Sequence, residues 1–223
     1  MNPKRRIALL VLLIVVAAVG IQVAHSAGAT HKAKAAAAPA PTLAPAAGPE
    51  AAALRAAAAA MQSLASYSFA GDVTTGGQKV TVAGEFSAPD HLHELLTIGP
   101  AAPVELVLIG TTEYQRAAPG SPWSSSAAAA GTSSDPRATF AALAQATTVI
   151  AKGSAYDFEL AGANAAALVA GSAQQASVAG TATVTAGQIT DLTYQSATGS
   201  TTVHFAYSAF GTTPAVTAPA GVG

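Results

Sequence analysis

The chain of 223 residues lacks cysteine altogether. This absence excludes disulfide bonds, thiol catalysis, cysteine-ligated zinc and lipidation of a cysteine. Charge is also scarce, since only 9% of the residues are Asp, Glu, Lys or Arg and the formal net charge is −1. Because no basic cluster follows the N-terminal segment, the sequence does not predict binding to nucleic acid or to anionic lipid head groups.

Familiar catalytic motifs are missing as well. The sequence contains no G-x-S-x-G, S-x-x-K or H-E-x-x-H motif and no glycine-rich loop of the kind that cradles phosphate. We therefore expect a protein that is not an enzyme, with no catalytic residue and no cofactor. A pair of carboxylates brought together by the fold stays open as an alternative, because such a pair leaves no local signature.

The N-terminal segment, residues 1–29, is typical of an export signal. Lys4, Arg5 and Arg6 precede a predominantly apolar run from Ile7 to Val23, and such a run enters the membrane while its cationic end stays in the cytoplasm. Small residues follow at a spacing suited to cleavage, yet the run is also nearly long enough to span a bilayer. The segment is therefore predicted to be either a cleaved signal peptide or an N-terminal membrane anchor. In both cases the rest of the chain is exported to the extracytoplasmic cell envelope, membrane-anchored or secreted.

Three further parts follow this segment. Residues 30–49 are rich in Ala and Pro, a composition that forms a stiff, extended linker and no packed core. Residues 50–219 carry the helical and alternating patterns and are predicted to form one folded domain. Residues 220–223 form a C-terminal tail.

The expected elements of the folded domain segregate along the chain. Residues 49–67 predict a helix that begins at Pro49, and alternating apolar residues then predict a series of strands up to residue 116. After a loop that contains Trp123, a second helix is expected over 134–153. A strand, a short helix and three more strands complete the pattern. Such segregation is typical of an α+β fold with helices on one face of a largely antiparallel sheet.

Two histidines, His91 and His93, lie one residue apart on an expected strand. Side chains two positions apart share a face of a strand, and this face is opposite to that of Leu92, Leu96 and Ile98. Two histidines alone do not define a metal site, so we expect a solvated strand surface and no metal. Five carboxylates mostly fall on the polar parity as well and are interpreted as solvated: Asp72, Glu85, Glu94, Glu105 and Glu113.

Several strand motifs occur in an order that resembles a known family. They are "SYSFAGDV" after a helix, "VAGEFSAPD" at a strand end, "TTEYQR" after a short turn, and the closing "YSAFGTTPAVTAPA". Over about residues 50–219 this pattern resembles actinobacterial envelope proteins of the LolA-like superfamily, which includes LppX- and LprG-type lipoproteins. One departure is plain, because those lipoproteins carry a lipidated cysteine and this chain has none.

The resemblance implies a strongly curved antiparallel sheet, an incomplete barrel, with helices covering its concave face. It also implies a hydrophobic cavity between sheet and helices that binds acyl chains of lipids or lipoproteins, as in a carrier or chaperone without covalent chemistry. An envelope membrane protein is a further partner to consider. The alternative is a non-transport extracytoplasmic sensor or protein-partner module on the same fold.

The lining of such a cavity is expected to come from the apolar parity of the strands. The strand residues predicted to line it are Phe69, Val73, Val82, Phe86, Leu92, Leu96, Ile98, Leu106, Leu108, Tyr114, Val203, Phe205 and Tyr207. The helix residues predicted to cover it are Leu54, Met61, Leu64, Phe140 and Leu143. Each could equally be ordinary core, because the apolar face of a sheet is covered whether or not a ligand is present.

Overall fold

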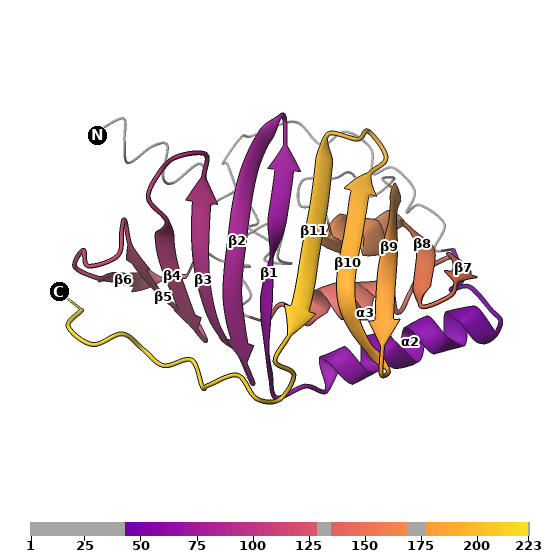
Figure 1. Ribbon diagram of the computed structural model, residues 1–223, viewed down its shortest axis with the longest axis horizontal. Helices are drawn as coiled ribbons and strands as arrows, with labels where there is room; N and C mark the ends of the chain where they lie inside the picture. The colour runs from indigo at the N-terminus through magenta and orange to yellow at the C-terminus, as the bar shows by residue number, and fades with distance from the viewer. Residues whose placement is uncertain (1–42, 129–134, 169–176, 223) are drawn as a thin grey trace, which may run out of the picture.

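The computed structural model describes residues 43–128, 135–168 and 177–222 (Figure 1). The N-terminal segment 1–29 and most of the linker lie outside the described residues. The helices are α2 (Pro49–Gln62), α3 (Ala138–Leu143) and α4 (Gly162–Leu168). The strands are β1 (Ser66–Thr75), β2 (Gln78–Ser87), β3 (His91–Ile98), β4 (Val104–Ile109), β5 (Thr112–Arg116), β6 (Ser124–Ala127), β7 (Thr148–Lys152), β8 (Ala155–Ala161), β9 (Ser177–Thr185), β10 (Gln188–Ser196) and β11 (Thr201–Ser208).

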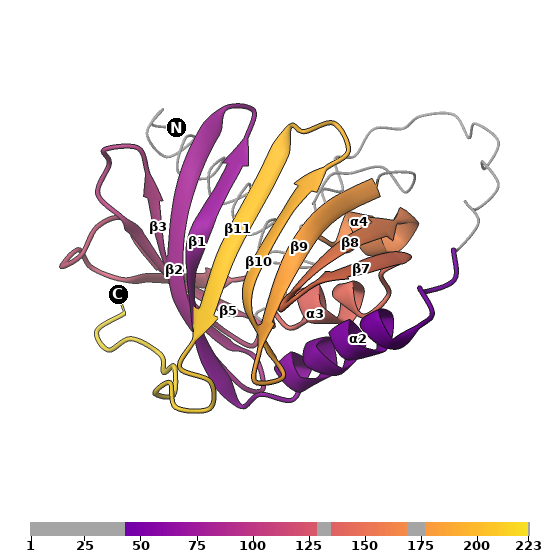
Figure 2. The ribbon, with the colours of Figure 1, turned by 45° about the vertical axis from the view of Figure 1, so that its right-hand side comes forward.

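All of these strands belong to one 11-stranded antiparallel sheet in the order β6-β5-β4-β3-β2-β1-β11-β10-β9-β8-β7. The first strand of the chain therefore pairs with the last, and the two series of hairpins extend outward from that central pair. Figure 2 shows how strongly the sheet curves without closing into a barrel, with α2, α3 and α4 gathered near β7–β10. The prediction of an α+β fold with a strongly curved antiparallel sheet, an incomplete barrel with helices on its concave face, is confirmed.

The predicted helix over 134–153 is wrong in its second half. The helix α3 ends at Leu143, and residues 148–152 instead form β7, which pairs with β8. Four consecutive β-branched residues, Thr147 to Ile150, favour the extended backbone. The hydrogen bond from Thr147 N–H to Glu159 O, 2.8 Å, starts this pairing.

Other boundaries shift less. The first helix ends at Gln62 rather than 67, because Ser66 and Tyr67 already pair with β2. The segment after Trp123, predicted as a loop, adds the short strand β6 to the edge of the sheet. Among the described residues, no helix has the length and apolar character needed to cross a membrane.

Glycines within the strands bring aromatic rings and backbone into close approach. A Cβ built on Gly84 would lie 2.5 Å from Phe69 Cζ, and one on Gly180 would lie 2.7 Å from Phe158 Cζ. A Cβ on Gly71 would lie 1.9 Å from the carbonyl oxygen of His204 on the neighbouring strand. These positions accept no larger residue, and the missing side chains at Gly84 and Gly180 let the neighbouring rings approach the backbone closely.

The chain after β11 forms a C-terminal strap, which we define as residues 213–222. Thr213 Oγ1 lies 3.2 Å from Ser68 Oγ, and the Val216 N–H donates to Ser87 Oγ over 2.9 Å. Val222 reaches a bridge with Trp123 beside β6. The strap therefore follows the ends of β1, β2 and β3 toward the far edge of the sheet, as Figure 1 shows.

Replacing Ser87 with alanine is expected to lower the free energy of unfolding by about 1 kcal/mol, because it leaves the buried Val216 N–H without an acceptor. Urea unfolding measures this loss. Ser125→Ala is the matched control, since Ser125 is exposed. Equal stability of the two variants would show that the strap contributes nothing through this hydrogen bond.

Candidate functional site

The inner face of the sheet, defined as the face turned toward the helices, is built by the register of the strands. One row across it joins Tyr67, Phe86, Leu92 and Leu108, which lie opposite one another in successive strands. Directly opposed residues point to the same face, and every second residue along a strand does so too. The inner face therefore follows from the pairing of the strands together with the parity read from the sequence.

Most of the predicted lining residues lie on this inner face. Those that the structure buries are Phe69, Val73, Val82, Phe86, Leu92, Leu96, Leu106, Leu108, Val203 and Phe205. Ile98 and Tyr207 are half-buried on the same face, and the helix residues Leu54, Met61, Phe140 and Leu143 are buried against it. Leu64 also packs on this core, but from the turn after α2 rather than from a helix.

Tyr114 is the exception among the strand residues. The two-residue turn at 110–111 places Tyr114 opposite Val107, whereas Leu106 and Leu108 lie opposite Gln115 and Glu113. Tyr114 therefore points to the outer face of the sheet. Its assignment to the cavity was wrong. The length of the turn sets which residues of β5 lie opposite the inward residues of β4, and this two-residue turn puts Glu113 and Gln115 there rather than Tyr114.

Aromatic rings fill the centre of the inner face. The ring of Tyr67 lies 5.2 Å from that of Phe86, 6.1 Å from Phe140 and 5.8 Å from Tyr207, measured between centroids. The guanidinium of Arg137, at the start of α3, lies 4.9 Å from the centroid of the Phe86 ring. Contacts of this kind add about 0.5–1.5 kcal/mol each beyond burial. The cluster thereby joins α3 to the centre of the sheet.

This aromatic centre is closely packed. The space bounded by Tyr67, Phe69, Thr139, Phe205 and Tyr207 has a volume of about 10 Å³, about the size that one water molecule needs. An acyl chain can enter here only if the rings change rotamer. The hydroxyl of Tyr67 is buried without a hydrogen-bond partner, and burial raises its pKa well above the ordinary value.

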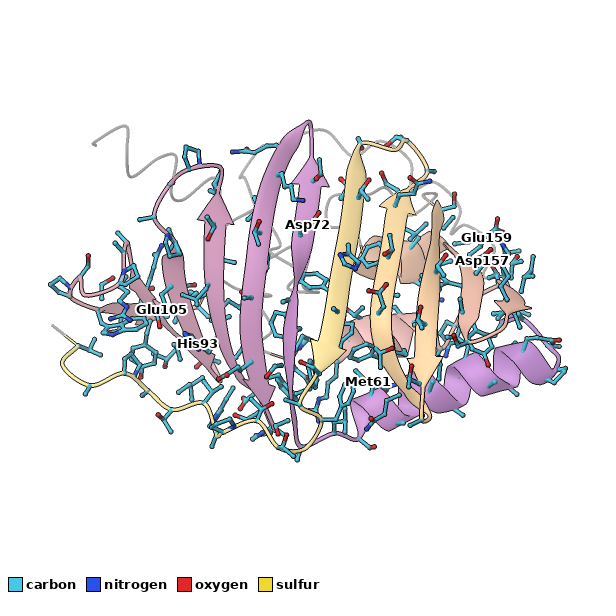
Figure 3. The ribbon with its side chains drawn as sticks, viewed as in Figure 1. Met61, Asp72, His93, Glu105, Asp157 and Glu159 are labelled. Carbon is cyan, nitrogen blue, oxygen red and sulfur yellow. The ribbon has the colours of Figure 1, made fainter. Side chains whose placement is uncertain are left out.

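A larger hollow of about 460 Å³ lies over β7–β10. Most of its lining residues belong to the outer face, including Asp157, Glu159, Thr181 and Thr193. Figure 3 shows Asp157 and Glu159 together at this end of the sheet. Asp157 binds Lys152 and accepts a hydrogen bond from Thr181, and these bonds lower its pKa. The carboxylates of Asp157 and Glu159 in its lining make this hollow unsuited to an acyl chain.

The histidines take part in contacts on the outer face. His93 Nε2 lies 2.8 Å from Glu105 Oε1, and His91 Nδ1 lies 2.9 Å from the carbonyl oxygen of Val216 in the strap. Burial alone would raise the pKa of Glu105, but hydrogen bonds from Arg116 and His93 outweigh it and lower that pKa. Figure 3 shows His93 and Glu105 on adjacent strands. No group of three or more potential metal ligands occurs in the part of the chain that the structure describes.

Glu94 is the functional candidate that the sequence analysis misplaced. It lies opposite Gly84 and Leu106 on the inner face and is 0% exposed. Neither carboxyl oxygen has a hydrogen-bond partner, and burial raises the pKa of this group to about 8. The sequence signal was present, since Glu94 shares the parity of Leu92 and Leu96.

Glu113 was misassigned in the same way. It lies opposite Leu108 and therefore on the inner face. Its side chain is half-buried, and burial raises its pKa. The interpretation of both carboxylates as solvated strand surface was wrong, because parity and not residue type decides which face a strand residue occupies.

Comparisons with known proteins identify the fold. No family model and no curated protein sequence matches the chain. The crystal structure of LprF from Mycobacterium bovis is similar, with a TM-score of 0.55 and 13% identity, covering 77% of this chain and 97% of that one. The lipoprotein LppX of Mycobacterium tuberculosis is similar with a TM-score of 0.50 and 12% identity, covering 75% and 97%. The chain therefore has the LolA-like fold of these mycobacterial proteins.

Proposed function

We propose that this is an exported envelope protein that binds the acyl chains of a lipid or lipoprotein between the inner face of the sheet and the helices. It would act as a carrier or chaperone and perform no covalent chemistry. The observation that carries the proposal is the largely apolar inner face of an open, strongly curved sheet, in a fold shared with the lipoprotein LppX. Apolar surface of this extent binds chains through the hydrophobic effect without directional contacts.

The domain plan fits this role. Residues 1–29 would export the protein as a signal peptide or retain it as a membrane anchor, and the linker 30–49 would hold the domain 50–219 away from the membrane. Retention would supply the tether that a lipidated cysteine provides in LppX-type lipoproteins. An envelope membrane protein would then be the partner that delivers or receives the lipid.

A second function is supported by a different observation. The aromatic centre of the inner face encloses only about 10 Å³ between Tyr67, Phe205 and their neighbours, as expected of a filled core. A filled core suits a sensor or protein-partner module on the same fold. The two functions differ in whether a ligand occupies the inner face.

Detergent-free purification of the full chain from an actinobacterial host, followed by native mass spectrometry, tests the proposal. We expect a co-purifying acylated lipid that dissociates on activation. Leu96→Trp adds bulk to the inner face and is expected to reduce the bound lipid about 10-fold, because it fills space that the chains would occupy. Leu95→Trp is the matched control, since Leu95 is half-buried and has the opposite parity.

A bare protein mass that stays unchanged after incubation with envelope lipid extract would contradict the carrier function and favour the partner module. Equal lipid content in both tryptophan variants would instead place the lipid elsewhere on the molecule. Circular dichroism and thermal unfolding of the variants verify that both keep the fold.

A further inference from the structure

Glu94 differs from the other acidic side chains of the described residues. Asp72, Glu105 and Asp157 pair with Lys79, Arg116 and Lys152 respectively. Glu94 is fully buried, and both its carboxyl oxygens lack a hydrogen-bond partner. A buried polar group without a partner costs about 1–3 kcal/mol, so its presence calls for a compensating function.

The surroundings of Glu94 are apolar on each side. Along β3 its neighbours on the inner face are Leu92 and Leu96, and across the sheet they are Leu106 on β4 and Gly84 on β2. Gly84 contributes no side chain, and the ring of Phe69 packs over it. The carboxyl group is therefore a polar group with apolar neighbours on each side within the inner face of the sheet.

No cationic side chain balances this carboxyl group on the inner face, as far as the structure describes the chain. Lys79, Arg116 and Lys152 belong to the outer face, where each pairs with an acid. Arg137 is held by Asp135, and Arg55 donates to the carbonyl oxygen of Ala46. The other acidic group on the inner face nearby is Glu113, two strands away.

In the described part of the chain the carboxyl groups of this face have no cation left to pair with, because Arg137, which lies over the Phe86 ring, is held by Asp135. Such a face discriminates among amphiphiles. A fatty acid anion or a phosphate head group would bring an unpaired negative charge into this apolar face, which is costly in an apolar medium. A hydroxyl group meets no such penalty, because it both donates and accepts a hydrogen bond. Since burial keeps Glu94 protonated near neutral pH, its carboxyl group can likewise both donate and accept a hydrogen bond.

We propose that Glu94 is the polar recognition point of the inner face and hydrogen-bonds a free hydroxyl group of an uncharged acylated polyol. The chains of this ligand would lie along the apolar rows on either side of Glu94. The polyol is a glycerol or a sugar, which present the same hydroxyl chemistry. This inference rests on the proposed lipid-binding function and specifies the head group.

Competition binding with the full chain tests the inference, using displacement of a fluorescent acyl probe. The ligands are dioleoylglycerol, which has a free hydroxyl, trioleoylglycerol, which has none, an oleoyl ester of glucose, and oleate. The wild-type protein is expected to bind dioleoylglycerol about 10-fold more tightly than trioleoylglycerol, the factor that one buried hydrogen bond provides. The glucose ester, compared with dioleoylglycerol, shows which polyol is preferred.

Variants assign the selectivity to Glu94. Glu94→Leu is expected to bind both acylglycerols equally, while Glu94→Gln, which still hydrogen-bonds, keeps most of the preference. Leu95→Met is the matched control on the same strand, since Leu95 has the opposite parity to Glu94 and the change preserves volume and polarity, so the ratio stays unchanged. If Glu94→Leu does not fold, the ratio of the two acylglycerol affinities, compared between the wild type and Glu94→Gln, still tests the inference.

The outcomes separate this inference from the function on which it rests. Equal binding of di- and trioleoylglycerol by the wild type, or oleate binding more tightly than dioleoylglycerol, overturns the role of Glu94 and leaves lipid binding intact. A preference that persists in Glu94→Leu also overturns it. If none of the four ligands displaces the probe from any variant, the lipid-binding function itself fails.

Discussion

Replacing Glu94 with leucine is expected to stabilise the protein by about 4 kcal/mol more at pH 8 than at pH 4. The carboxyl group has a pKa of about 8 in the folded chain, against 4.5 for an unperturbed Glu, because it is buried without a partner. Each unit of difference corresponds to about 1.4 kcal/mol. This is the largest pH-dependent contribution that we expect from a single residue of the domain.

The sign follows from proton binding. Between pH 4.5 and 8 the unfolded chain has released the Glu94 proton while the folded chain retains it. The folded state then binds more protons, so the wild-type free energy of unfolding falls as pH rises through this range. Below pH 4.5 the group is protonated in both states and contributes no slope. Glu113, whose pKa burial also raises, acts in the same direction.

Urea unfolding at a series of pH values measures this contribution as the difference between wild type and variant, which cancels Glu113 and the other titrating groups. Glu94→Gln is the control for the loss of ionisation alone and is expected to remove the same slope. Parallel pH profiles for wild type and Glu94→Leu would show that the carboxyl group is solvated in solution and not buried.

Introducing lysine at Val82 is expected to abolish cooperative folding, whereas lysine at the preceding Thr81 is expected to change the free energy of unfolding by less than about 0.5 kcal/mol. Val82 is 0% exposed and lies between Gly71 and Leu96 on the inner face. A lysine there would bury an unpaired charge, which costs several kcal/mol out of a total stability of about 5–15 kcal/mol. Thr81 is exposed and lies opposite Asp72, which would attract the new ammonium group.

Circular dichroism and denaturant titration of the two variants distinguish the faces of β2. A folded Val82→Lys protein with wild-type stability would mean that the inner face is solvated, which would rule out the proposed apolar binding site for acyl chains. Val82→Leu serves as a further control, since it changes shape without adding charge.

Local pattern determined much of this protein before any tertiary contact was considered. The alternation in β1, β2 and β11 identified Phe69, Val73, Val82, Phe86, Val203 and Phe205 as inward-facing, and the structure buries all six. Period two is a property of the extended backbone itself, so a strand that is correctly located assigns its own faces. The same rule correctly placed His91 and His93 on the outer face.

Where sequence reasoning failed, the parity of a strand residue was misjudged, or a helical pattern was continued too far. Glu94 was grouped with carboxylates of the polar parity, although it shares parity with Leu92. Tyr114 was assigned to the apolar, inward parity, although the short turn before it sets the opposite parity. In β7, Thr148 and its neighbours prefer an extended backbone and pair with β8. The helix before them is therefore shorter than the sequence pattern predicted.

The sequence by itself determined the faces of β1, β2 and β11, the absence of cysteine chemistry and the α+β class. Only the tertiary structure decided that β1 pairs with β11, that the strap runs along β1–β3, and that aromatic rings occupy the space over Gly84 and Gly180. These contacts join residues more than a hundred positions apart, or depend on register across several strands. Local propensity carries no information about them, because their energy comes from surfaces that meet only after the chain has folded.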